Sequence, residues 1–238
     1  MPPRGEPSPG AKLLLDPQAM DQQREAAMRQ QLDRQREALR QRDPSVVARL
    51  AAMSLVLDGG ERVRLEGELW RTPYAITWPD IKITCLAGKM PVTLRHESAW
   101  LHYLERADGQ PLAGRWVNLR EIGGVFYQDA FQGYAGDELA AAWGADRDGF
   151  VRRCRALGGW EVRGLADVAF EWPALPRLPL CVCYRQPAGE VAAWATVLFD
   201  ASAGHYVAAD VAAILGKDLV ERLKPDQRDG SRREADRP

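Results

Sequence analysis

The pattern of apolar and polar positions first predicts a long helix. Residues 17–43 are rich in strong helix formers and lack glycine, and Asp16 followed by Pro17 is typical of a helix start. Three apolar residues make a thin stripe along this helix: Met28, Leu32 and Leu39. Because such a stripe is too narrow for a core helix, we expect the helix to lie along the domain or to self-associate weakly, and to be dispensable for folding. Pro44 is expected to break or kink it before residues 45–55 continue.

The pattern then changes to the alternation of β-strands. Residues 62–70 and 74–85 alternate apolar and polar side chains, which predicts two strands joined by a turn at residues 71–73. Residues 178–186 and 192–200 are nearly continuous apolar runs, and such runs are typical of central strands that are buried on both faces.

Further helices are interleaved with these strands. Four segments have helical spacing or helix-ending residues: 93–106, 137–143, 148–157 and 209–224. Because the order of elements is irregular, with no repeated strand–helix unit, the sequence predicts an α+β fold, a single mixed domain with a helical N-terminal extension. The expected organisation is a disordered segment 1–16, the helical extension 17–50, the α+β domain 51–224 and a disordered charged tail 225–238.

One segment between these elements is rich in proline. Prolines recur at every third position in the segment FEWPALPRLPL: Pro173, Pro176 and Pro179. This spacing is the repeat of a polyproline II helix, which could serve a proline-binding module if it were exposed. Its apolar flanks favour a rigid lead-in to the following strand.

Composition and charge exclude several classes of function. The chain is 46% hydrophobic and 27% charged, as in a soluble globular protein, and its net charge of −1 gives no general attraction to nucleic acid or to an anionic membrane. No apolar run is long enough for a membrane-spanning helix, and the short Leu13–Leu15 run is too brief for a signal peptide. We therefore expect a cytoplasmic protein whose four cysteines stay reduced.

Most catalytic and metal-binding motifs are absent from the sequence. There is no phosphate-binding glycine loop, no dinucleotide-binding motif and no GxSxG elbow. His96 and Glu97 would begin a zinc-protease motif, but Trp100 stands where the second histidine is required. Cys181 and Cys183 share one face of a predicted strand, where packing in the core is the favoured interpretation, and the cysteine spacing does not suit an iron–sulfur cluster.

His102 is the first candidate functional residue. It falls away from the apolar cluster of its predicted helix, beside Ser98 and Glu105. It is therefore either a solvated histidine held by Glu105 or a base or axial ligand that faces a cleft.

The second candidate is the stretch VLFDASAGHYVAADVAAILG, in which Asp200 ends a buried strand and His205 and Tyr206 follow. In a structural role, Asp200 would bond to the turn backbone and His205 and Tyr206 would pack the loop. In a functional role, Asp200 and His205 would share a cleft with His102 or Tyr127 on the opposite wall. Asp200→Asn would then cost less than about 1 kcal/mol of stability but abolish ligand binding.

Several of these segments together resemble a known family. The segments are residues 101–131, the LGG at 157–159, WPALPRLPL at 172–180 and the stretch that contains Asp200. In this combination and order they are similar to the domain-of-unknown-function family numbered 3786, over residues of about 60–224. His102, Tyr103, Phe126, Tyr127, Phe131, Asp200, His205, Tyr206 and Asp210 match residues of the family's motifs.

The resemblance implies a setting but no reaction. The family occurs chiefly in anaerobic bacteria and archaea, and some members carry a four-cysteine iron–sulfur domain like that of a corrinoid protein. It therefore implies a ligand-binding or accessory protein of anaerobic metabolism that handles a corrinoid or another tetrapyrrole, with a corrinoid or iron–sulfur protein as partner. The N-terminal extension of this chain contains no cysteine. The alternatives are an enzyme that uses Asp200, His205 and His102 for acid–base chemistry, and a scaffold that acts through its N-terminal helix.

Overall fold

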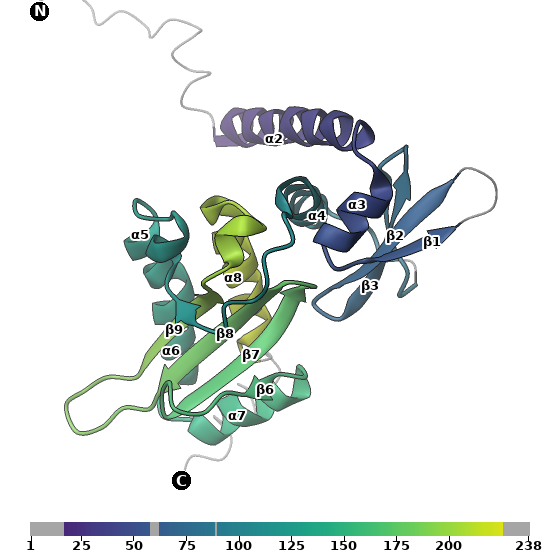
Figure 1. The fold of residues 1–238 in the computed structure, drawn as a ribbon. Helices are drawn as coiled ribbons and strands as arrows, with labels where there is room; N and C mark the ends of the chain where they lie inside the picture. Colours follow the sequence, from purple (N-terminus) through teal and green to yellow (C-terminus); the bar gives the residue numbers. More distant parts are fainter. Residues whose placement is uncertain (1–16, 58–61, 89, 226–238) are drawn as a thin grey trace, which may run out of the picture.

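The computed structural model describes residues 17–57, 62–88 and 90–225, and it has the α+β fold that the sequence predicts (Figure 1). Two antiparallel sheets are combined with helices, and one continuous cluster of buried apolar side chains joins them. The segments that are predicted to be disordered, residues 1–16 and 225–238, lie outside the described residues, apart from residue 225. No helix in the described ranges is both long and apolar enough to cross a membrane.

The N-terminal segment forms helix α2 (Pro17–Arg40) and, after the predicted break, helix α3 (Pro44–Leu50). The prediction that α2 is too weakly apolar to join a core is wrong, because Leu32 and Leu39 are fully buried in the main cluster. They are two turns apart on one face of α2, which packs against helix α4 (Leu94–Arg106). Helix α2 is therefore joined to the core by these two leucines.

The first sheet is an antiparallel meander of four strands: β1 (Ser54–Leu57), β2 (Val63–Leu69), β3 (Thr72–Trp78) and β4 (Ile83–Cys85). The β2–β3 hairpin has a turn of two residues, Trp70 and Arg71, so the turn begins one residue before the predicted position. Their φ angles of 53° and 61° are those of a type I′ turn, which normally contains Asn and Gly. Bulky side chains are strained in this conformation.

The second sheet is also antiparallel, with the strand order β5-β9-β8-β7-β6. The strands are β5 (Trp116–Val117), β6 (Trp160–Glu161), β7 (Val168–Leu175), β8 (Leu178–Arg185) and β9 (Trp194–Asp200). Strands β8 and β9 are the buried strands that the sequence predicts. The proline-rich segment is neither a polyproline helix nor the rigid lead-in that its flanks favour. It forms most of the β7–β8 hairpin, with Pro173 opposite Pro179 next to an irregularity in the register. Such irregularities tolerate residues that lack an N–H donor.

The predicted helices are all present, and the structure adds the short helix α5 and short helical turns at residues 119–122, 133–137 and 203–205. Five α-helices follow α3 in the described residues. They are α4, α5 (Gln128–Gln132), α6 (Glu138–Trp143), α7 (Arg147–Ala156) and α8 (Ala209–Leu223). Helix α6 contacts β9, α7 contacts β7, and α8 packs between α4 and α7, so these helices lie on one face of the second sheet (Figure 1).

The opposite face of the second sheet carries a small separate cluster, formed by Ala169, Cys181 and Cys183 beneath Trp116 and Leu165. All four cysteines of the chain are free and buried, as expected for packing residues. In the described part of the chain, no three Cys, His, Asp or Glu side chains are grouped so that they could hold a metal ion.

Candidate functional site

Asp200 is buried, and its carboxylate holds two backbone segments together through hydrogen bonds. Its carboxylate accepts hydrogen bonds from the backbone N–H groups of Ala113 (2.9 Å) and Gly114 (2.8 Å), and from the N–H (2.9 Å) and hydroxyl (2.6 Å) of Ser202. Burial by itself would raise the pKa of Asp200, but these four donors together lower it below the ordinary value. The carboxylate therefore ties the end of β9 to residues 113–114.

His205 and Tyr206 bind the same segment at other points. His205 places Nδ1 2.7 Å from Oδ2 of Asp108, and both side chains are about half exposed. Tyr206 is fully buried, stacks on Tyr103 with ring centroids 5.5 Å apart, and donates its hydroxyl to the carbonyl of Gln110. The structure therefore does not bring Asp200 and His205 together as a pair. With Asp200, these two residues fasten the connection between α4 and β5.

His102 belongs to α4, and its side chain faces Gln31 of α2. The expectation of a solvated histidine is wrong. His102 is only 9% exposed, and its Nε2 lies 3.3 Å from Nε2 of Gln31. Glu105 does not hold it, because Glu105 accepts a hydrogen bond from Gln35 (2.6 Å). Burial lowers the pKa of His102 below its ordinary value. The sequence pattern of α4 could not show this burial, since α2 covers the polar side of that helix.

The remaining candidate, Tyr127, lies apart from these residues. It precedes α5 and is 56% exposed, next to Phe126, which is 94% exposed. The groove that Asp200 lines is lined by neither His102, Tyr127 nor His205. The predicted residues therefore do not form one site.

The residues beside His102 do not suit a corrinoid or another tetrapyrrole. An open groove of about 690 Å³ lies there, and most of its walls are charged or amide side chains: Gln31, Arg34, Gln35, Glu105 and Arg106. No phenylalanine, tyrosine or tryptophan is among the residues that line it, and its one aromatic ring is the imidazole of His102. A large flat macrocycle needs predominantly apolar and aromatic walls, so this groove lacks the surface that would hold one.

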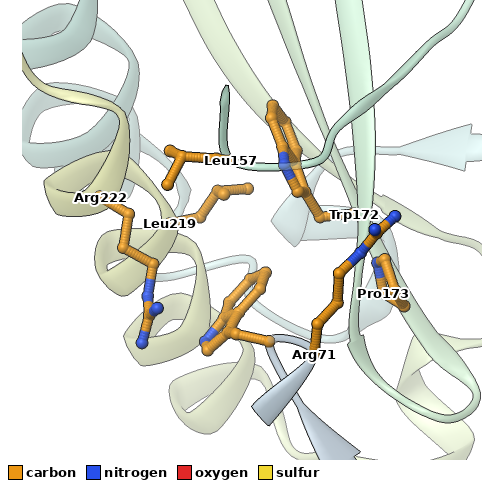
Figure 2. Close-up of a pocket in the computed structure, with 7 residues that line it drawn as sticks. Arg71, Leu157, Trp172, Pro173, Leu219 and Arg222 are labelled. Atoms are coloured by element: carbon orange, nitrogen blue, oxygen red, sulfur yellow. The ribbon is translucent and has the colours of Figure 1, made fainter. Parts of the chain in front are cut away.

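A different cavity lies where the two sheets meet. It measures about 70 Å³ and is lined by Trp70, Arg71, Leu157, Trp172, Pro173, Leu219 and Arg222. These residues come from the β2–β3 turn, the end of α7, strand β7 and helix α8. Figure 2 shows Trp172 facing Leu157 and Leu219 across the cavity, with Arg71 and Arg222 on opposite sides.

Local structure positions the tryptophans of this junction cavity. The backbone N–H of Trp70 donates to the carbonyl of Ala174 (2.9 Å), which fixes the tip of the β2–β3 hairpin against β7. A Cβ atom at Gly159 would overlap the indole of Trp172, so glycine at this position leaves room for the ring. The cavity therefore depends on a strained turn and on a glycine contact.

Two buried polar atoms at this junction have no hydrogen-bond partner among the residues that the structure describes. They are the indole Nε1 atoms of Trp70 and Trp172, whose side chains both line the cavity. An indole N–H can only donate, and buried donors in proteins are almost always paired. Two such donors therefore belong to side chains that line one cavity.

Two cationic side chains line the cavity, and one of them is paired with an acidic residue. Arg222 lies 5.6 Å over the Trp70 ring and donates to Asp218 through Nε (3.2 Å), while Arg71 lies 4.6 Å over the ring of Trp160. Both charged residues that line the cavity are arginines. The side chains that line the cavity therefore include two cations and no acidic group.

Sequence reasoning missed this cavity, although part of it was visible. Leu157, Trp172 and Pro173 belong to the LGG and WPALPRLPL segments that carry the family resemblance. The part of the cavity at the β2–β3 turn could not be predicted, because nothing in Trp70 and Arg71 indicates a type I′ turn.

Comparison with known proteins supports the resemblance. A model of the family described as "Domain of unknown function (DUF3786)" matches residues 43–222. No curated protein matches the chain, and no solved structure does. The match covers most of the chain, both sheets and the whole junction cavity. This chain belongs to the DUF3786 family.

Proposed function

We propose that this protein is a ligand-binding accessory protein whose junction cavity binds a small carboxylate with an apolar tail. The observation that carries the proposal is the pair of unpartnered indole donors, on Trp70 and Trp172, at a cavity whose charged lining residues are both arginines. The four reduced, buried cysteines support a cytoplasmic location.

The chemistry of the walls supports this class of ligand. A carboxylate has several acceptor positions, which could satisfy indole N–H groups and guanidinium groups together. Leu157, Leu219 and Pro173 supply apolar surface for a short tail. Both indole nitrogens are closed off from solvent, so the ligand must displace lining side chains to reach them.

The other hypotheses from the sequence have less support. The acid–base enzyme requires Asp200 and His205 to converge, but their hydrogen-bonding capacity is used on different parts of residues 108–114. A corrinoid and a corrinoid-protein partner stay predictions from the resemblance, and the groove at His102 offers no phenylalanine, tyrosine or tryptophan wall for the macrocycle.

Calorimetric titration with sodium propionate tests the proposal. We expect saturable binding of propionate, weaker binding of inorganic phosphate because the walls are apolar, and no binding of the neutral analogue propionamide. Arg71→Asn and Arg222→Gln should each weaken propionate binding roughly tenfold, the magnitude of one charge-assisted hydrogen bond.

Arg185→Gln is the matched control for these variants. Arg185 also lies over a tryptophan ring, 5.5 Å from the centroid of Trp194, but it does not line the cavity. This variant should bind propionate like the wild type. Equal loss in all three variants, or no saturable binding of propionate, would contradict the proposal.

A further inference from the structure

A second recess lies on the outer face of the second sheet and differs in chemistry from the junction cavity. It is a groove of about 420 Å³ between the sheet and the α4–β5 connection, which Asp200 fastens. Trp160 and Glu171 lie at one end and Trp116 at the other. Prolines 173, 176 and 179 line the space between them. This volume is within the usual range for small-molecule pockets.

The charged residues that line this outer groove are both acidic. Asp200 is one, and its oxygens already accept four hydrogen bonds. Glu171 is the other, and in the part of the chain that the structure describes its carboxylate makes no hydrogen bond or ion pair. Burial raises the pKa of Glu171, which reflects how poorly this carboxylate is solvated.

Glu171 lies beside an exposed aromatic face. It is the direct cross-strand partner of Trp160, so the two side chains are neighbours on the same face of the sheet. Trp160 is 56% exposed, and Arg71 lies 4.6 Å from its ring centroid. The protein's own guanidinium thus shows that a cation fits against this ring. A tryptophan face next to a carboxylate is the usual arrangement for recognising organic ammonium groups.

From this arrangement we infer that the outer groove binds a small organic cation, with its ammonium group at Trp160 and Glu171 and its apolar part along the prolines toward Trp116. Trp172 and Pro173 line both recesses. The inference does not depend on the proposed carboxylate site, because the charged lining residues of the two recesses have opposite sign. Arg71 links them: it lines the junction cavity and occupies the face of Trp160.

Calorimetric titration with choline chloride tests the inference, with sodium chloride at equal ionic strength as the blank. We expect saturable binding of choline and at least tenfold weaker binding of its uncharged analogue 3,3-dimethylbutan-1-ol. Trp160→Leu should weaken choline binding by a factor of about 3 to 30, the range of a cation–π contact. Glu171→Gln should also weaken choline binding, because it removes the negative charge beside the ammonium group. Glu190→Gln and Trp194→Leu alter an exposed carboxylate and an exposed tryptophan elsewhere and should change nothing.

Arg71→Asn separates this inference from the proposed function. Removing the guanidinium frees the face of Trp160, so the variant should bind choline more tightly while it binds propionate more weakly. Equal binding of choline and its neutral analogue, or unchanged choline binding in both Glu171→Gln and Trp160→Leu, would overturn the inference. Much tighter binding of a trimethyllysine peptide than of choline would overturn its assignment to a free small molecule.

Discussion

Asp200 shows how the set of donors around one carboxylate decides between a structural and a functional role. A catalytic or ligand-binding carboxylate keeps acceptor positions for its substrate, whereas Asp200 directs both oxygens at donors of its own chain. Asp200→Asn should therefore lower the free energy of unfolding by about 2–4 kcal/mol, since an amide cannot accept from all of these donors. Chemical denaturation measures this loss.

His205→Ala is the comparison for Asp200→Asn. His205 and Asp108 are about half exposed, and such surface pairs contribute less than about 1 kcal/mol. A loss of under about 1 kcal/mol in Asp200→Asn, as a functional site would give, would show that Asp200 does not hold the two backbone segments together.

The buried histidine His102 makes stability depend on pH. Burial lowers its folded-state pKa, so below the ordinary value of about 6.5 the unfolded chain binds more protons than the folded one. Stability should therefore fall as the pH drops from neutral toward the lower, folded-state pKa. His96 contributes in the same direction, because burial lowers its pKa as well.

The variant His102→Gln tests how much of this pH dependence of stability comes from His102. Urea unfolding of this variant at a series of pH values should show a weaker loss of stability on acidification than the wild type shows. An identical pH dependence in both proteins would mean that His102 does not titrate differently in the folded and unfolded states.

At the scale of elements, Arg71 in the strained β2–β3 turn should favour the proposed binding and lower the stability of the fold. Arg71 has a φ of 61°, a conformation that costs a non-glycine residue roughly 1–2 kcal/mol. Arg71→Gly should therefore raise the midpoint of urea unfolding while it weakens propionate binding. Arg71→Ala removes the same charge but keeps the strain, so it should weaken binding without stabilising the fold. A destabilised glycine variant would show that the turn is not strained.

Helix α2 is the second element whose role can be measured. Leu39 is fully buried against the core, whereas Met28 on the same stripe is only partly buried. Leu39→Ala should lower the free energy of unfolding by about 2–5 kcal/mol, and Met28→Ala by clearly less. Similar, small losses in both variants would support the sequence-based expectation that the helix is dispensable.

At the scale of the whole molecule, the sequence predicts elements better than their assembly. The spacing in residues 93–106 and 209–224 and the apolar runs of β8 and β9 are local signals, and each is confirmed. Strand β7 was missed because the proline spacing outweighed its apolar alternation. Strand β7 pairs with β8 in a hairpin, and the spacing of the prolines does not predict the register of that hairpin.

The candidate sites were harder to predict for the same reason. The burial of His102 depends on α2, about 70 residues earlier in the chain. The junction cavity brings together side chains from four separate elements of both sheets and the helical layer. No periodicity within a single element contains that information, whereas the segments of the family resemblance identify part of the cavity.

The central claim is that Trp70 and Trp172 keep their indole N–H groups for a ligand in the junction cavity. Proton–nitrogen correlation spectra test it directly, because each of the eight tryptophans gives one indole signal and Trp70→Phe and Trp172→Phe identify these two. We predict that sodium propionate shifts both signals downfield and saturably, as expected for N–H groups that gain a charged acceptor, while Trp194 does not respond. Unmoved signals from Trp70 and Trp172 across a titration in which calorimetry records propionate binding would place the ligand elsewhere and contradict the account.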